Sequence, residues 1–261
     1  MSSVSKAFDH GRAFIAFVTC GDPDLETTEA LIRATAEAGA DLIELGIPFS
    51  NPTAEGPVVQ AANLRALSEG ATTDRILEMV ARVRGEVRVP LAFLTYANVV
   101  FSYGTDRFCA AAARAGIDAL ILPDVPFEEK ADFVPACRRH GIDFISLVAP
   151  TSEQRTAMIA REAEGFVYCV SSLGVTGVRG LITTDVGKMV GLVRAASSVP
   201  AAVGFGISTP EQAKEMARKA DGVIVGSAIV KLVAQYGRDA APHVAEYVRS
   251  MKCAVQAADC L

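Results

Sequence analysis

Histidine is scarce in this sequence, and no histidine lies near another. The chain has three, His10, His140 and His243. Metal centres in proteins need several ligands brought together, often from closely spaced His and Cys residues. This distribution therefore argues against a His-rich metal centre, and we expect no metal site. No G-x-S-x-G segment is present around a nucleophilic serine either.

The six cysteines include no Cys-x-x-Cys pair, and several lie inside apolar runs. The first ten residues also lack the apolar run of a secretory signal. This usage is typical of reduced core thiols in a cytoplasmic protein, which is the location we expect. Cys20 differs from the others because it falls in a predicted loop.

Long apolar runs and blocks of positive charge are absent as well. No stretch of about 18 uncharged apolar residues occurs, so we expect no membrane span. The chain has 30 acidic and 25 basic residues, interspersed, for a net charge of −5. A protein that binds nucleic acid usually carries a basic patch or tail. We therefore expect no nucleic-acid partner.

What is present is ample material for one large core. The chain has 261 residues, of which 51% are hydrophobic and 21% charged. This composition excludes intrinsic disorder. No linker or low-complexity tract divides the sequence, so residues 1–261 are expected to form a single domain.

One unit recurs along the chain: a helical pattern ends at a small residue or glycine, and a short apolar run follows. Ala113–Asp118, for example, leads into Ala119–Leu122. The runs are short and mostly non-alternating, which is typical of parallel strands buried on both faces. Strands are predicted at Ala13–Val18, Leu42–Leu45, Pro90–Leu94, Ala119–Leu122, Phe144–Val148, Phe166–Val170, Pro200–Val203 and Val223–Val225.

Helical patterns lie between these runs. They are predicted at Leu25–Glu37, Gly56–Leu67, Thr73–Arg84, Asp106–Ala115, Phe127–His140, Glu153–Glu164, Thr184–Ala196, Thr209–Lys219 and Ser227–Val255. Eight strands alternating with helices over about 250 residues predict an α/β fold of the (β/α)₈ TIM-barrel class. A doubly wound open sheet is the alternative. It usually has a glycine-rich turn after the first strand, and Thr19–Pro23 is not G-x-G-x-x-G.

Glu44 is the most unusual residue at a predicted strand end. It is flanked by Ile43 and Leu45 inside a buried strand. A buried, unpaired carboxyl group has a raised pKa, which a general acid working near neutral pH requires. The other interpretation is that Glu44 pairs with a base or caps a loop amide. Its placement slightly favours the functional one.

Two further acids follow strand ends and are more ambiguous. Glu55 lies in a Pro/Gly-rich loop, where it would be either solvated or the partner of Glu44 in acid–base work. Asp124 precedes Val125-Pro126, and we favour a role in which it orients a loop by accepting backbone N–H groups.

The glycines of the last two strand ends predict an anion site. Gly204-x-Gly206 ends the seventh strand, and Gly226-Ser227 ends the eighth and opens a helix. In TIM barrels these two loops and a helix N-terminus form the usual phosphate site. The alternative is that they are ordinary tight turns.

Residues 171–184 are rich in Gly, Ser and Thr and include Arg179. They are interpreted either as a lid over the site or as a surface loop. No lysine stands at a predicted strand end, which argues against Schiff-base chemistry.

Several segments together resemble the α subunits of tryptophan synthase over nearly the whole chain. They are Phe17–Pro23, Glu44–Ser50, Ala54–Gln60, Tyr96–Asn98, Pro123–Pro126, Gly174–Gly177, Gly204–Ser208 and Gly226–Val230. Other phosphate-binding barrels share the glycine sites, but they would not explain the segment Glu44–Ser50.

The resemblance implies a (β/α)₈ lyase of tryptophan biosynthesis. It would cleave indole-3-glycerol phosphate to indole and glyceraldehyde 3-phosphate by a retro-aldol step. It would need no metal or cofactor, and pyridoxal phosphate would belong to a β-subunit partner in an α₂β₂ heterotetramer.

The resemblance also implies roles for individual residues. Glu44 would protonate indole C3 and take the proton of the 3′-hydroxyl. Glu55 would hold the indole N–H and stabilise the positive charge that develops there. Thr176 would lie in the lid. The pocket positions are Phe17, Leu94, Ile121, Tyr168 and Phe205, and the phosphate positions are Gly177, Gly206, Gly226 and Ser227.

The chain departs from the family pattern at three positions. Glu55 stands where the family usually has Asp, Asn51 replaces an Asp of the loop that faces the β subunit, and Ser172 replaces a commonly basic lid residue. Asn51 and Ser172 leave open a free-standing indole-3-glycerol phosphate lyase. A third possibility is a weakly catalytic barrel that acts as the allosteric partner of a β subunit. The presence of both Glu44 and Glu55 argues against it.

Overall fold

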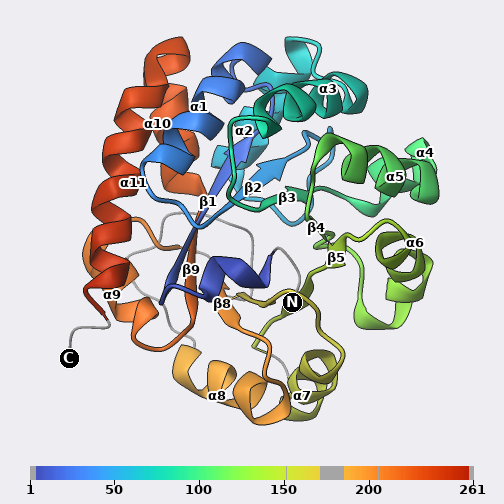
Figure 1. Ribbon diagram of the computed structural model, residues 1–261, viewed down its shortest axis with the longest axis vertical. Coiled ribbons are helices and arrows are strands. Elements are labelled where there is room, and N and C mark those ends of the chain that lie inside the picture. The colour runs from blue at the N-terminus through green and yellow to red at the C-terminus, as the bar shows by residue number, and fades with distance from the viewer. Residues whose placement is uncertain (1–3, 151, 171–184, 205, 259–261) are drawn as a thin grey trace.

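The strands of the computed structural model form one parallel sheet, and helices surround it (Figure 1). The structure describes residues 4–150, 152–170, 185–204 and 206–258. The order of strands in the sheet is β5-β4-β3-β2-β1-β9-β8-β7-β6. The strands are β1 (Ala13–Thr19), β2 (Leu42–Gly46), β3 (Leu91–Leu94), β4 (Ala119–Ile121), β5 (Asp143–Phe144), β6 (Ser146–Val148), β7 (Val167–Val170), β8 (Ala201–Gly204) and β9 (Gly222–Val225).

The fifth strand position is shared by β5 and β6, and this closes the barrel. β5 pairs with β4 through Phe144 and Leu120, whereas β6 pairs with β7 through Leu147 and Tyr168. Ile145, between the two short strands, donates its N–H to the carbonyl of Leu120 at 3.0 Å. The segment that contains β5 and β6 therefore pairs with β4 on one side and with β7 on the other, which joins the two ends of the sheet. The predicted (β/α)₈ barrel is confirmed, although the break at Ile145 was not predicted.

Helices cover the outside of the barrel. The α-helices are α1 (Leu25–Glu37), α2 (Pro57–Ser68), α3 (Thr73–Arg84), α4 (Ala97–Tyr103), α5 (Thr105–Ala115), α6 (Val134–Arg139), α7 (Glu153–Arg161), α8 (Val186–Ala196), α9 (Pro210–Ala217), α10 (Ser227–Tyr236) and α11 (Ala240–Gln256). The described residues also form the 3₁₀ turns η1 (Ser5–Phe8), η2 (Phe127–Asp132) and η3 (Gly237–Asp239).

Two of the predicted helices are wrong as single elements. The segment Ser227–Val255 breaks at Gly237, whose φ of 55° cannot continue a right-handed helix. The segment Phe127–His140 is a 3₁₀ turn followed by α6, which has Pro135 in its first turn. Proline suits that position because its missing N–H has no helical partner there. Helix α4 was not predicted at all.

The inside of the barrel is a packed core. Inward-facing side chains from most of the strands form one buried cluster with Phe166 and Tyr168. Val4 and Ala7 belong to the same cluster, and Phe8 packs against it with its ring 5.8 Å from that of Phe166. The turn η1, dark blue in Figure 1, therefore packs its apolar side chains against this core.

Three aspartates of the recurring sequence unit, Asp41, Asp118 and Asp221, form hydrogen bonds with the amino-terminal ends of neighbouring strands. Each accepts a hydrogen bond from the first or second residue of the preceding strand in the sheet. The bonds run from Phe14 N to Asp41, from Leu91 N to Asp118 and from Ala201 N to Asp221, at 2.6, 2.9 and 2.9 Å. They stabilise the amino end of the barrel, which leaves the carboxyl end free for chemistry.

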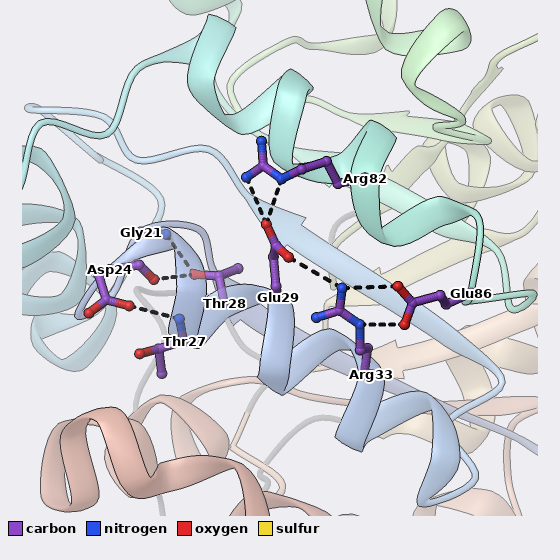
Figure 2. A network of polar contacts seen from close by, with 8 residues as sticks. All are labelled: Gly21, Asp24, Thr27, Thr28, Glu29, Arg33, Arg82 and Glu86. Atoms are coloured by element: carbon purple, nitrogen blue, oxygen red, sulfur yellow. Dashed lines mark hydrogen bonds and ion pairs between the residues drawn. The ribbon is translucent and has the colours of Figure 1, made fainter.

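A polar network attaches α1 to α3 on the outside (Figure 2). Glu29 of α1 accepts two hydrogen bonds from Arg82 of α3, at 2.9 and 2.7 Å. Arg33 donates to Glu86 just beyond α3, at 2.7 and 3.2 Å. At the start of α1, Asp24 accepts from Thr27 N, and Thr28 links the carbonyl of Asp24 to the N–H of Gly21. The network holds the β1–α1 loop beside the carboxyl end of β1.

Across the segments that the structure describes, we find no helix with the length and apolarity needed to cross a membrane.

Candidate active site

A cavity that opens to solvent lies among the carboxyl ends of the strands. Many of the residues singled out from the sequence line it. They are Phe17, Glu44, Glu55, Leu94, Tyr168, Gly206, Gly226 and Ser227. Six more of the described residues line it, none of which was assigned to the site from the sequence: Ala54, Val59, Pro123, Leu147, Ile207 and Ile224. These six are ordinary apolar or small residues, and only the closed barrel brings them to one place.

Glu44 is a buried carboxyl group in the wall of this cavity. In the sheet it lies between Phe17 of β1 and Ala92 of β3, and it is 1% exposed. Its Oε1 atom has no hydrogen-bond partner in the part of the chain that the structure describes. Burial raises its pKa to about 8, so the group holds its proton at neutral pH. The structure therefore favours a proton donor over a salt-bridged or capping glutamate.

Glu55 enters the cavity from the loop between β2 and α2. It is 7% exposed, and its Oε2 accepts a hydrogen bond of 2.6 Å from the side-chain amide of Asn63. Its main-chain carbonyl accepts another from Gln60 at 2.7 Å. Burial raises the pKa of Glu55 to about 7, while the bond from Asn63 lowers it. Glu55 thus ionises more readily than Glu44 in the same cavity.

The neighbouring loops hold this segment in place. The hydroxyl of Tyr96 accepts a hydrogen bond from Ala54 N at 3.0 Å, and the Tyr96 ring packs 5.1 Å from that of Phe49. Both carboxylate oxygens of Asp124 accept from Ala97 N at 3.1 Å, where α4 begins. The interpretation that Asp124 orients a loop is confirmed.

Two aromatic side chains of the wall lie against glycines. A Cβ at Gly46 would come 2.7 Å from the Phe17 ring, and one at Gly226 would come 3.3 Å from it. A Cβ at Gly204 would come 2.7 Å from the Tyr168 hydroxyl. Any side chain at these positions would displace a ring, so glycine sets the shape of the apolar wall.

Another part of the wall, which includes Gly206, Gly226 and Ser227, suits an anion. Gly206 follows β8 with a φ of 78°, and Gly226 immediately precedes α10, whose first residue is Ser227. The N-terminus of a helix presents free N–H groups and the positive end of the helix dipole. Both features therefore favour a negatively charged group at this end of the cavity.

One residue proposed from the sequence, Ile121, is described but is not among the residues that line the cavity. It is fully buried in the inner core cluster. Thr176, Gly177 and Phe205 lie outside the described residues, as do Ser172 and Arg179.

Cys20 is buried although it follows the end of β1. Burial raises the pKa of its thiol well above the usual value. A protonated, enclosed thiol is a poor nucleophile, so Cys20 behaves as a core residue.

The arrangement supports proton transfer on an elongated, mainly apolar molecule with a negative end. A neutral carboxyl group can donate a proton, and a second carboxylate can stabilise positive charge. Apolar walls exclude water from both. Within the described segments, no group of three or more His, Cys, Asp or Glu residues is arranged to hold a metal ion.

The sequence matches the family model described as tryptophan synthase alpha chain over residues 5–258. The tryptophan synthase alpha chain of Lacticaseibacillus casei is 44% identical over 257 residues, which cover 98% of this chain and 97% of the relative. That of Geobacter sulfurreducens is 49% identical over 239 residues, covering 89% and 90%.

Solved structures agree with the sequence comparisons. A structure of Mycobacterium tuberculosis tryptophan synthase superimposes with a TM-score of 0.89 at 33% identity, covering 97% of this chain and 98% of the other. The tryptophan synthase subunit alpha of Legionella pneumophila gives a TM-score of 0.88 at 34% identity, covering 98% and 99%.

Proposed function

Because the chain belongs to the tryptophan synthase alpha chain family, we propose that Glu44 and Glu55 are the residues with which it performs the family's reaction. The chain is a lyase of tryptophan biosynthesis. It cleaves indole-3-glycerol phosphate to indole and glyceraldehyde 3-phosphate. The observation that carries the assignment is Glu44, a buried carboxyl group with a pKa of about 8 in a cavity wall.

In the proposed mechanism Glu44 acts twice. It first donates its proton to indole C3, which leaves a positive charge spread toward the ring nitrogen. The Glu44 carboxylate then takes the proton of the 3′-hydroxyl. As the carbonyl forms, the bond between C3 and the glycerol carbon breaks, and its electron pair restores the aromatic indole. Glu44 ends the cycle protonated, as it began.

Glu55 stabilises the intermediate between these two steps. Its carboxylate accepts the hydrogen bond of the indole N–H and offsets the positive charge that protonation creates. This requires an ionised Glu55 beside a neutral Glu44, and the pKa values of about 7 and about 8 lie in that order. Two carboxyl groups with different roles set by their surroundings are a known means of acid–base catalysis.

The rest of the cavity would bind the two halves of the substrate. We place the indole ring between Phe17, Leu94 and Tyr168, whose side chains supply apolar contact. The phosphate would lie at Gly206, Gly226 and Ser227, at the N-terminus of α10. Gly177, Thr176 and Phe205 stay predictions from the family resemblance.

We propose that the chain needs no cofactor of its own, because Glu44 supplies the proton that indole C3 gains and takes up the proton that the 3′-hydroxyl loses. A cytoplasmic location is supported by the free thiols of Cys20, Cys109, Cys137, Cys169 and Cys253.

The partner of the chain is a tryptophan synthase β subunit, and we propose an α₂β₂ heterotetramer in which pyridoxal phosphate belongs to that subunit. The large apolar side chain of Phe101, on α4 directly beyond β3, is 51% exposed, and a docked subunit would cover it. Asn51, where the family usually has Asp, is also exposed, on the loop that carries Glu55.

The test is the release of indole from indole-3-glycerol phosphate by the purified chain, alone and with a β subunit. Slow release that rises strongly with the β subunit would support the heterotetramer. Fast release that ignores it would identify a free-standing lyase and contradict the proposed assembly. Absence of release in both cases would contradict the catalytic assignment. In the Asn51→Asp variant, stronger activation by the β subunit would show that this loop transmits the signal.

A further inference from the structure

Asn63 is buried beside Glu55 but does not line the cavity. It lies on the second turn of α2, is 3% exposed, and donates its Nδ2 hydrogen bond to Glu55 Oε2 at 2.6 Å. The cavity wall includes Glu55 but not Asn63. Any effect of Asn63 on the reaction must therefore pass through Glu55.

The Glu55 side chain needs such a partner more than an aspartate would. Glutamate has one more rotatable bond than the Asp that the family usually has here, so more conformations must be restricted to place its carboxylate. Glu55 also lies on a loop, and loops hold functional groups less precisely than helices do. A hydrogen bond from a helix side chain supplies the missing restraint.

Helix α2 is well suited to provide it, because its side chains hold the surrounding loops at several points. Gln60 donates to the main-chain carbonyl of Glu55 at 2.7 Å, one turn before Asn63. Arg65 forms two hydrogen bonds with the buried carboxylate of Asp22, at 2.7 and 2.8 Å. The helix is thus fixed to the β1–α1 loop on one side and to the Glu55 loop on the other.

We propose that Asn63 is a positioning residue, which orients the Glu55 carboxylate toward the substrate nitrogen and keeps it negatively charged while Glu44 stays neutral. The inference rests on the proposed role of Glu55. Since only Oε2 is held by Asn63, Oε1 stays available for the indole N–H. The amide is uncharged and donates without neutralising Glu55, so the carboxylate keeps the charge that the intermediate needs.

The matched variants are Asn63→Leu, which keeps the size but removes the donor, and Gln60→Leu, which releases only the main chain of Glu55. The value of kcat/KM would be measured from pH 5.5 to 9.5 for these two variants, for the wild type and for Glu55→Gln. We expect Asn63→Leu to shift the acidic limb of the profile, which reports the ionisation of Glu55, to higher pH by about one unit. At pH 7, where the ionised fraction of Glu55 would fall from about one half to about one tenth, this lowers kcat/KM about fivefold. Gln60→Leu should leave that limb in place.

A double-mutant cycle with Glu55→Asp tests the bond directly. Aspartate withdraws the carboxylate by about one C–C bond, or about 1.5 Å, beyond hydrogen-bond reach of Asn63. The Asn63→Leu change should therefore cost much less in the Glu55→Asp enzyme than in the wild type. Thermal unfolding and the affinity for glycerol 3-phosphate are measured on every variant, to show that fold and anion site are intact.

The outcomes separate this inference from the proposed function. If Glu55→Gln removes the acidic limb but Asn63→Leu leaves it at its wild-type position, the positioning role is wrong and the role of Glu55 stands. If Glu55→Gln keeps the acidic limb, the assignment of Glu55 itself is wrong. Asn63→Leu and Gln60→Leu could instead shift the acidic limb equally. The position of the loop as a whole, and not the hydrogen bond to the carboxylate, would then control the reaction, which would also overturn the inference.

Discussion

Asp22 and Arg65 form a two-pronged ion pair between the β1–α1 loop and α2, with N–O distances of 2.7 and 2.8 Å. Asp22 is 2% exposed, whereas the Arg65 side chain is 39% exposed. The Asp22 carboxylate is buried in the loop that follows β1, and its ion pair with the Arg65 guanidinium offsets the cost of burying the negative charge. The pair therefore joins the β1–α1 loop to α2, the helix that follows the Glu55 loop.

Loss of Arg65 should destabilise the protein because it leaves the Asp22 charge buried and unpaired. For Arg65→Leu we expect the free energy of unfolding in urea to fall by on the order of 2 kcal/mol, less than for a fully enclosed pair because Arg65 is partly exposed. The control is Arg82→Leu, which breaks a more exposed pair with Glu29 (Figure 2) and should cost less than about 1 kcal/mol. Equal costs would show that Asp22 does not depend on Arg65.

Removal of the Glu44 proton should stop the reaction without weakening anion binding. We expect Glu44→Gln to lower kcat by at least about 10²-fold, while the affinity for glycerol 3-phosphate changes little. The matched control is Glu69→Gln, which changes an exposed glutamate at the end of α2. Substantial turnover by Glu44→Gln would remove Glu44 from its assigned role.

The two glutamates also predict a bell-shaped dependence of kcat/KM on pH. Activity should rise as Glu55 ionises with a pKa of about 7 and fall as Glu44 loses its proton with a pKa of about 8. The maximum should therefore lie between about pH 7 and pH 8. In Glu55→Gln the rising limb should disappear while the falling limb stays. A flat profile from pH 6 to 9 would contradict both assignments.

Glu44 should also make the fold less stable as the pH rises. Its pKa is near 4.5 in the unfolded chain and about 8 in the folded one, so the folded state binds more protons between these values. Its contribution is fully favourable below about pH 4.5 and is lost as the pH rises through 8. The glutamine of Glu44→Gln does not ionise, so the variant does not lose this stability. The unfolding free energy of Glu44→Gln relative to that of the wild type should therefore grow between pH 5 and 8, by on the order of a few kcal/mol. A pH-independent difference would show that Glu44 ionises normally when folded.

A methyl group at position 204 should disturb the cavity through Tyr168. The Cβ of Gly204→Ala would lie 2.7 Å from the Tyr168 hydroxyl and force the ring to move. A displacement near 1 Å can cost on the order of 10²-fold in rate, so we expect kcat/KM to fall at least tenfold. The control is Gly191→Ala in α8, where a Cβ meets nothing within 4 Å. That change should leave activity intact and stabilise the helix by about 0.5–1 kcal/mol. If both variants keep full activity, the position of the Tyr168 ring does not limit the reaction.

The strands could be predicted because each is a short apolar run with distinct boundaries, and their eight positions agree with the structure. The division of the fifth into β5 and β6 could not, since Phe144–Val148 is uniformly apolar except for Ser146. It follows from the need to pair with both β4 and β7. The prediction of where α10 ends was wrong for another reason. Gly237 is itself a signal that a helix ends, but the apolar pattern on both sides was interpreted as one helix, and the φ of 55° shows that the chain turns there.

Glu44 was recognisable from local sequence alone because a carboxyl group among Leu42, Ile43 and Leu45 has few ways to stay solvated. The bond from Asn63 to Glu55 was not, because eight positions separate the two residues and many asparagines lie on exposed helix faces. The aspartates of the recurring unit are an intermediate case. The sequence shows them at Asp41, Asp118 and Asp221, but their bonds to the preceding strand appear only when the strands are side by side.

Local sequence by itself determined the alternation of strands and helices, the buried position of Glu44 and the family to which the chain belongs. These properties depend on the order of apolar, small and charged residues along short segments, which the chain carries whatever its shape. Tertiary structure alone decided the closure of the barrel through Ile145, the apolar walls of the cavity and the different pKa values of Glu44 and Glu55. Each of these depends on which distant segments exclude water from a group or donate a hydrogen bond to it, and those contacts exist only once the barrel has closed.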